Sequence, residues 1–310
     1  MDILVRPLQE RDLPEADRIL RLAFGTFFGL PDPMTFAAGI DLVRGRWRTD
    51  PSAALAAEVE GQLAGSNFVT NWGSVGYFGP LSVRPDLWDK GIASRLLERT
   101  MALLQRWGTR HAGLFTFPQS PKHVGLYQKF GFWPRFLTPV MAKEAARPEM
   151  EPDWSRYSDI VETERGPCLE ACRSLTGAIY EGLDVSRDVL AVARYGLGDT
   201  VLLWDGRELT GLAVCHCGQG TEAGKDTCFV KFGVARGAQE FEALLDACET
   251  LAAARGLSLL QASVNTARHD AYQRMLARGF RTGRLQGVTM HRPNEPGYSR
   301  PDVYAMDDWR

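Results

Sequence analysis

The segment from Val83 to Leu97 reads Val-Arg-Pro-Asp-Leu-Trp-Asp-Lys-Gly-Ile-Ala-Ser-Arg-Leu-Leu. An apolar run from Tyr77 to Val83 precedes it and predicts a strand, and apolar residues continue at helical spacing up to Leu104. Gly91 stands where the loop becomes the helix. The first amides of a helix have no acceptor within the helix and lie at the positive end of its dipole. This strand, loop and helix therefore predict an anion site that suits a pyrophosphate.

The same order of elements occurs again in the second half of the chain. The sequence predicts a strand from Phe229 to Val234 and a helix from Phe241 to Leu251. Val83 and Val234 are 151 positions apart, whereas the Gly-Phe pairs that begin at Gly131 and Gly279 are 148 positions apart. The loop of the second copy is therefore three residues shorter. A repeat of this length predicts two similar domains.

The boundary between the copies is expected at a stretch rich in proline and acidic residues. We predict a first domain at 1–145, a linker at 146–153 and a second domain at 154–292. The tail, 293–310, has no counterpart in the first copy, and its residues 303–306 predict a short extra strand. The mixed order of helices and strands in the first copy, with a hairpin that turns near Gly61, favours an α/β class with a mixed α+β sheet.

The composition narrows the class of protein. Of 310 residues, 45% are hydrophobic and 24% are charged, which excludes a disordered chain, a collagen and a coiled-coil rod. A net charge of −2 predicts no nucleic-acid partner, and the short basic run 44–48 is expected to be a solvated face. The sequence has neither an apolar run of membrane-spanning length nor a secretory signal pattern at its start, so we expect no membrane partner and a cytoplasmic location.

Two motifs in the first copy resemble the GNAT superfamily of acyl-CoA-dependent N-acetyltransferases. The family's loop reads (Gln/Arg)-x-x-Gly-x-(Gly/Ala), and Trp88-Asp-Lys-Gly-Ile-Ala93 matches it after Leu81-Ser-Val83, except that Trp88 replaces Gln or Arg. The family's closing Tyr-x-x-x-Gly-Phe resembles the segment Tyr127 to Phe132. The second copy follows the same pattern, although more weakly. The whole chain therefore resembles a tandem GNAT protein. The resemblance implies two GNAT-like domains, each a mixed, mostly antiparallel sheet flanked by helices.

The resemblance also implies where acetyl-CoA binds as co-substrate. In the family, the strand before the loop pairs with the pantetheine arm, and the amides of the loop hold the pyrophosphate. This assigns CoA contacts to Leu81, Ser82, Val83, Trp88, Asp89, Lys90, Gly91, Ile92, Ala93 and Ser94. The backbone of Leu81 is also expected to polarise the thioester carbonyl, and a donor in such a place contributes about 10²–10³ in rate.

Proton transfer is implied at several side chains. Tyr127 matches the family's general acid, which protonates the leaving thiolate; the alternative is a helix tyrosine packed on the sheet. The base that receives the amine's proton is left open among Glu58, His123 and a chain of water molecules. Four phenylalanines form either core or one wall of the acceptor site. They are Phe24, Phe27, Phe28 and Phe36.

The second copy lacks the residues that this chemistry needs. Its loop is shorter, and acidic Glu240 stands where a phosphate would bind. Met275, which has no proton to give, occupies the position of Tyr127. We therefore interpret the second domain as a degenerate copy and expect one CoA per chain. No metal is expected, because alternation along a strand places Cys215 and Cys217 on one face and His216 on the other.

The leading hypothesis is an acyltransferase that moves an acetyl group to a primary amine by direct attack in the first domain. One alternative is a non-catalytic acyl-CoA sensor or scaffold, which the replacement at Trp88 favours. Another is acetylation of the amine of a small thiol precursor. The expected partner is a small-molecule or peptide amine, and the chain is expected to act as a monomer or a homodimer.

Overall fold

The computed structural model describes residues 1–146 and 153–310, so most of the predicted linker lies outside the described residues. We call the first copy unit one and the second copy with its tail unit two. Unit one contains β1 (Ile3–Pro7), α1 (Leu13–Phe27), α2 (Arg44–Thr49), β2 (Ala54–Val59), β3 (Gln62–Trp72), β4 (Val75–Phe78), β5 (Ser82–Val83), α3 (Ile92–Arg106), β6 (His111–Thr116), α4 (Pro121–Gln128) and β7 (Trp133–Glu144).

Unit two repeats this order and adds a strand from the tail. It contains β8 (Trp154–Arg156), α5 (Glu162–Ile179), α6 (Ser186–Tyr195), β9 (Gly198–Asp205), β10 (Glu208–Cys217), β11 (Thr227–Ala235), α7 (Ala238–Ala254), β12 (Leu259–Ser263), α8 (His269–Ala277), β13 (Arg281–Arg292) and β14 (Tyr304–Met306). β14 lies close to the strand that the sequence predicts at 303–306.

The strands form one continuous 14-stranded sheet, in the order β1-β2-β3-β4-β6-β13-β7-β12-β11-β10-β9-β8, with β5 paired to β3 and β14 paired to β11. β4 and β6 are parallel, as are β11 and β12, and the other pairs are antiparallel. The predicted class, a mixed and mostly antiparallel sheet flanked by helices, is therefore confirmed.

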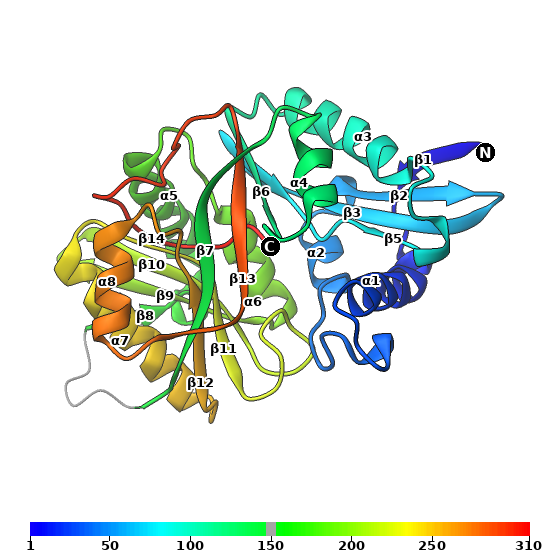
Figure 1. The fold of residues 1–310 in the computed structure, drawn as a ribbon. Coiled ribbons are helices and arrows are strands. Elements are labelled where there is room, and N and C mark those ends of the chain that lie inside the picture. Colours follow the sequence, from blue (N-terminus) through cyan, green and yellow to red (C-terminus); the bar gives the residue numbers. More distant parts are fainter. Residues whose placement is uncertain (147–152) are drawn as a thin grey trace.

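The last strands of the two units change places. β13 lies between β6 and β7, and β7 pairs with β12 of unit two. Figure 1 shows these two long strands side by side at the centre of the molecule. The sheet therefore continues across the predicted boundary, and each unit completes its sheet with a strand of the other.

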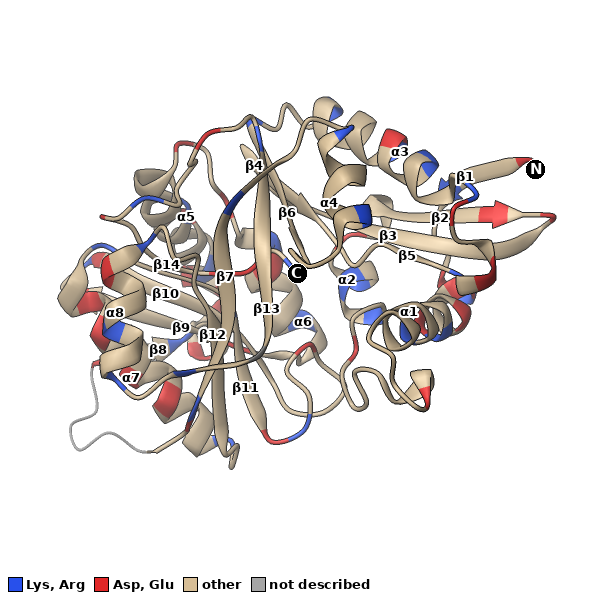
Figure 2. Cartoon of the chain, in the orientation of Figure 1, with Lys and Arg blue, Asp and Glu red and all other residues tan. Residues whose placement is uncertain are grey.

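The helices bury apolar side chains on both faces of this sheet. α3 and α4 enclose one cluster with Phe78 and Phe132, and α1 packs in another with Phe68. A third cluster joins the units, because Trp72 and Tyr77 of unit one pack there with Val189 of α6. Acidic and basic side chains both lie along α3 and α8, where neighbouring groups form ion pairs (Figure 2).

Candidate active site

The strand that the sequence predicts from Tyr77 to Val83 is divided in two. β4 pairs in parallel with β6 only over Val75–Tyr77, and the chain resumes pairing, with β3 alone, at β5. Pro80 lies between these segments and has no N–H to continue a ladder. β4 and β6 therefore separate after Tyr77, and we call the opening between β5 and β6 the V-shaped slot.

The backbone of β5 leaves one edge free in this slot. The amide of Arg84 donates to the carbonyl of Ala64 on β3 at 2.8 Å. Because backbone groups alternate in direction along a strand, Ser82 faces β3 in the same way, and the groups of Leu81 and Val83 face away from it. The two residues that the resemblance assigns to the pantetheine arm thus present their backbone toward the slot.

The loop after β5 leads directly to the N-terminus of α3. Gly91 is the residue before this helix and has φ +84°, a left-handed conformation that glycine adopts without steric penalty. A Cβ at Gly91 would meet no atom within 4 Å, so the space above this backbone is open. Asp89, Lys90 and Gly91 are exposed, and Ile92 is the first helical residue. The amides at the start of α3 are therefore accessible to an anion.

Trp88, which replaces the usual Gln or Arg, folds back onto the strand. Its indole nitrogen donates to the carbonyl of Val83 at 2.8 Å, and the ammonium of Lys122 lies 5.6 Å from the centre of its ring. Lys122 also pairs with Asp89 at 2.7 Å. Trp88 thus joins the end of β5 to the start of α4 and takes one of the strand's free acceptors.

Tyr127 lies on α4 with its ring against the strands of the slot. It is 9% exposed, and its ring centre is 5.9 Å from that of Phe78 at the end of β4. Burial raises the pKa of Tyr127 above its usual value, so the phenol keeps its proton at neutral pH. The structure therefore brings this side chain to the strand that precedes the slot.

The two side chains proposed as bases are placed very differently. Glu58 accepts from the guanidinium of Arg6 at 2.5 Å on the pair of strands β1 and β2, so it is engaged outside the slot. His123 lies one helical turn before Tyr127, with its ring 4.9 Å from that of Phe27. Burial, and then the charge of Lys122, lower the pKa of His123. His123 is thus neutral at pH 7 and able to accept a proton.

Aromatic rings gather beside His123, where α1 meets the end of β6. Phe117 contacts three phenylalanines of α1 and its C-terminal end, with ring centres 5.1–6.4 Å apart, namely Phe24, Phe27 and Phe28. Phe36 stacks on two of the same rings. Phe28 remains 38% exposed. These rings, with His123, form what we call the aromatic cluster, part of which faces solvent.

The equivalent slot in unit two is already filled. β11 pairs in parallel with β12 only over Thr227–Phe229, and β14 then pairs with the free edge of β11, Val234 opposite Ala305. Val234 is the repeat equivalent of Val83. The loop before α7 is short, and a Cβ at Gly237 would lie 2.8 Å from the Glu240 carboxylate. The chain itself thus occupies both the strand edge and the helix end that remain open in unit one.

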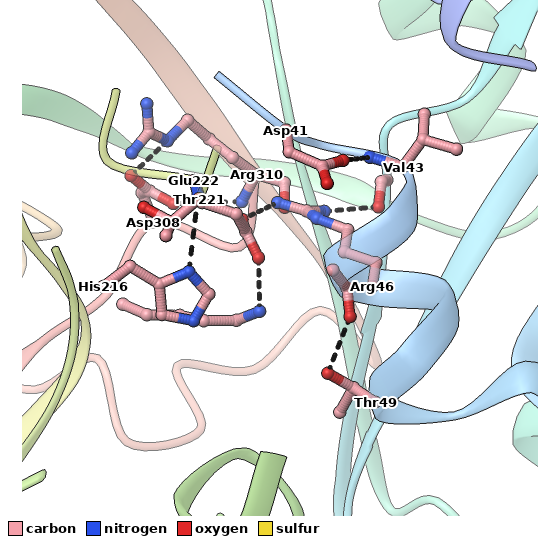
Figure 3. Close-up of polar contacts among 12 residues, drawn as sticks. Asp41, Val43, Arg46, Thr49, His216, Thr221, Glu222, Asp308 and Arg310 are labelled. Atoms are coloured by element: carbon pink, nitrogen blue, oxygen red, sulfur yellow. Dashed lines mark hydrogen bonds and ion pairs between the residues drawn. The ribbon is translucent and has the colours of Figure 1, made fainter. Parts of the chain in front are cut away.

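Sequence reasoning missed a basic residue of α2. The run 44–48 was expected to be solvated, but Arg46 is only 7% exposed. Its guanidinium donates to the carbonyl of Gly79 at 2.5 Å. It also donates to Glu222 of unit two at 2.5 Å (Figure 3). The solvated-face interpretation is therefore wrong for Arg46. A local signal could not have revealed this, because both partners are distant in sequence.

Comparison with protein families identifies the first unit. Residues 17–132 match the model described as the acetyltransferase (GNAT) family. The chain contains a GNAT acetyltransferase domain. The predicted resemblance and the predicted class of enzyme, an acyltransferase, are thereby confirmed. A comparison with curated protein sequences finds no match.

Solved structures with the GNAT fold resemble nearly the whole chain. A candidate acetyltransferase from Pyrococcus horikoshii has a TM-score of 0.71 at 16% identity, over 99% of this chain and 95% of its own. A GCN5-related N-acetyltransferase from Sphaerobacter thermophilus has a TM-score of 0.57 at 16% identity, over 94% and 95%. One from Anabaena variabilis has 0.53 at 14% identity, over 94% and 72%. At these identities the likeness concerns the fold.

No helix between 1 and 146 or between 153 and 310 has the length and apolar character needed to cross a membrane. The same ranges hold no group of three or more His, Cys, Asp and Glu arranged to bind a metal. Cys215 and Cys217 pack in one core cluster while His216 turns toward Glu222, as alternation along the strand predicts.

Proposed function

We propose that this GNAT domain transfers an acetyl group from acetyl-CoA to a primary amine by direct attack, and that the reaction takes place in unit one. The observation that supports this most strongly is the free edge of β5, which leads directly to left-handed Gly91 and the open end of α3. A strand edge and a helix N-terminus in this order match the two parts of CoA, an amide-containing arm and a pyrophosphate.

CoA would be held mainly by backbone groups. The amides of Ile92, Ala93 and Ser94 are free of helix partners and face the pyrophosphate in this proposal. The ammonium of Lys90 is exposed beside them and adds positive charge. Leu81 and Val83 pair with the pantetheine arm. The indole N–H of Trp88 donates to the carbonyl of Val83, so this carbonyl is not available to the pantetheine arm. Trp88 would therefore contact CoA through the face of its ring.

The reaction needs one acid and one base. The amine nitrogen attacks the thioester carbon, and the N–H of Leu81 stabilises the negative charge that develops on oxygen. The carbon–sulfur bond then breaks, and Tyr127 gives its proton to the thiolate of CoA. His123 receives the proton that the amine nitrogen loses. Because its side chain lies one turn from Tyr127, that proton can return to the phenolate and restore both groups.

The acceptor would enter past the aromatic cluster. Phe28 and Phe36 face solvent in part, and Phe117 connects them to His123 and to the end of β6. Flat apolar rings bury apolar area and stack on aromatic groups. We infer that the acceptor amine carries an apolar or aromatic body that packs on these rings.

Unit two would bind no CoA. β14 takes the strand edge that pantetheine would need, and the Glu240 carboxylate lies at the end of α7 that a phosphate would need. Met275 replaces the acid and is fully buried in the core. One CoA per chain is therefore the expected stoichiometry.

A coupled assay tests the proposal. The full chain is incubated with acetyl-CoA and, in turn, 2-phenylethylamine, spermidine, a peptide with free N-terminal alanine and a lysine peptide. Release of CoA thiol and a matching acetylated product are expected with at least one amine, and 2-phenylethylamine should be the best. Saturable CoA binding without thiol release for any amine would favour the sensor alternative.

A further inference from the structure

Arg46 and Glu222 lie in a buried charge network that joins the two units. The Glu222 carboxylate accepts from Arg46 at 2.5 Å and from the ammonium of Lys231 at 2.6 Å. Lys231 also pairs with Asp188 at 3.3 Å, and Asp188 accepts from the indole of Trp72 at 2.6 Å. Arg46 and Trp72 belong to unit one, and the other three residues belong to unit two. The network thus crosses the interface with every charge paired.

The other side of the Arg46 guanidinium holds the strand at which the slot opens. One nitrogen donates to the carbonyl of Gly79 and to the backbone oxygen of Arg310. Figure 3 shows Arg46 near Glu222 and Arg310. Gly79 is the second residue after the last parallel pair of β4, Tyr77 with Gly113. Two residues further along the chain is Leu81, whose N–H faces the thioester in the proposed reaction.

β6, which lies on the other side of the slot, is also held by a residue of the tail. The ring of Trp309, in the tail, covers Gly113 on β6 so closely that a Cβ there would overlap it. Trp309 has φ +54°, a conformation that is strained for a residue with a side chain. Its indole donates to the hydroxyl of Tyr298 at 2.9 Å, which donates to Asp307 at 2.9 Å. The chain just after β4 is therefore held at Gly79, and β6 is held at Gly113, close to the point where β4 and β6 separate.

Stability alone is a weak reason for such a network. Removing two charges from water costs free energy, and apolar residues of similar volume often stabilise an interface to the same extent or more. What apolar residues cannot do is donate to a backbone carbonyl in a fixed direction. A planar guanidinium held by a carboxylate can do this, because its N–H groups point in set directions.

We propose that unit two positions the catalytic strand of unit one through Glu222 and Arg46. Glu222 fixes the guanidinium, the guanidinium fixes the peptide of Gly79, and this peptide sets the direction of the Leu81 N–H. Both side chains are positioning residues, since neither touches a substrate. This gives the degenerate unit a role in catalysis, and it rests on the proposed function of unit one.

Glu222→Gln tests the connection with little change of shape. The neutral amide holds the guanidinium less firmly, and a misplacement of about 1 Å can reduce rate by about 10²-fold. We expect kcat with the best amine of the panel to fall about 10–100-fold, while the Kd of acetyl-CoA, measured by calorimetry, stays within twofold of the wild type. Arg46→Lys should act in the same way, because one ammonium cannot reproduce the fork that reaches Glu222 and Gly79 together.

Glu249→Gln is the matched control. Glu249 is also buried and ion-paired, with Lys143 at 2.6 Å, but it lies on α7, away from the slot. It should leave kcat unchanged. An NMR readout is independent of turnover: acetyl-CoA should shift the Leu81 amide resonance in the wild type and in Glu249→Gln, and shift it less in Glu222→Gln and Arg46→Lys.

Two results would overturn the inference. One is a fall in kcat for Glu222→Gln and Arg46→Lys no larger than that for Glu249→Gln. The other is a Leu81 shift that is the same in all four proteins. If the wild type binds acetyl-CoA but acetylates no amine, the proposed function fails, and the Leu81 comparison still decides whether unit two positions the strand.

Discussion

Replacing Gly91 by valine tests the anion site at its most specific point. The residue has φ +84°, and a left-handed conformation costs an L-residue about 1–2 kcal/mol, with valine at or above this range. No protein atom lies within 4 Å of the new Cβ, so the penalty comes from the backbone and not from a clash. Because the loop is exposed, we expect it to relax to negative φ in the free variant and turn its amides away from the ligand.

The expected loss of CoA affinity follows from this relaxation of the loop. CoA binding must restore the left-handed loop, so its affinity should fall by the same 1–2 kcal/mol, which is about 5–30-fold. The valine side chain also blocks the approach of the pyrophosphate, so this is the minimum loss. Calorimetry with CoA measures the change directly. The melting temperature without ligand should fall by less than about 8 °C, since the full penalty is about 1–2 kcal/mol and about 1 kcal/mol corresponds to about 2–4 °C in a chain of about 150–250 residues.

Unit two supplies controls for the backbone penalty. Gly279 has φ +90° with equally open space, so Gly279→Val carries the same strain and should leave CoA affinity unchanged. Gly237 has extended backbone, and Gly237→Val should also leave affinity unchanged. Wild-type affinity in Gly91→Val, or an equal loss in Gly279→Val, would refute the assignment of the pyrophosphate to the α3 loop.

Three further outcomes are expected. Tyr127→Phe should lower kcat by about 10²–10⁴ with little change in the Kd of acetyl-CoA, because only the proton donor is lost; steady-state kinetics would count against this role if kcat were unchanged. Calorimetry should give one CoA per chain, and two equal sites would contradict the filling of the second slot by β14. Burial lowers the pKa of His111 to about 4 and that of His291 to about 3. Their contribution to stability is therefore full above about pH 6.5 and is lost as pH falls from about 6.5 toward about 4 for His111 and about 3 for His291, by up to about 1.4 kcal/mol per pH unit for each histidine. Chemical denaturation from pH 7 to 5 should show this fall, and His111→Asn should make it shallower; an unchanged slope would exclude His111 as a cause.

Much of the proposed CoA site was predictable from the sequence because it is local. Gly91, the first residues of α3 and Val83 belong to one segment of strand, loop and helix, and backbone geometry follows there from neighbouring residue types. Tyr127 was predictable for the same reason, since its spacing to Gly131 is a property of one helix end. The structure places its ring beside Phe78 at the end of β4, a contact within unit one. Glu58 could not be judged in this way, because its engagement depends on Arg6 on another strand.

The sequence by itself determined that the chain has two related halves and that the loop before the helix is three residues longer in the first half, where we predict a phosphate site. A repeat offset, a glycine and a shortened loop are statements about residue order, and they need no coordinates. Only the tertiary structure decided what connects the halves. The exchange of β7 with β13, the pairing of β14 in the second slot and the contact of Arg46 with Gly79 and Glu222 all join residues far apart in the chain. Such contacts form only when distant segments pack together, because each buried polar group then needs a hydrogen-bond partner. Which groups become partners is therefore a property of the whole fold.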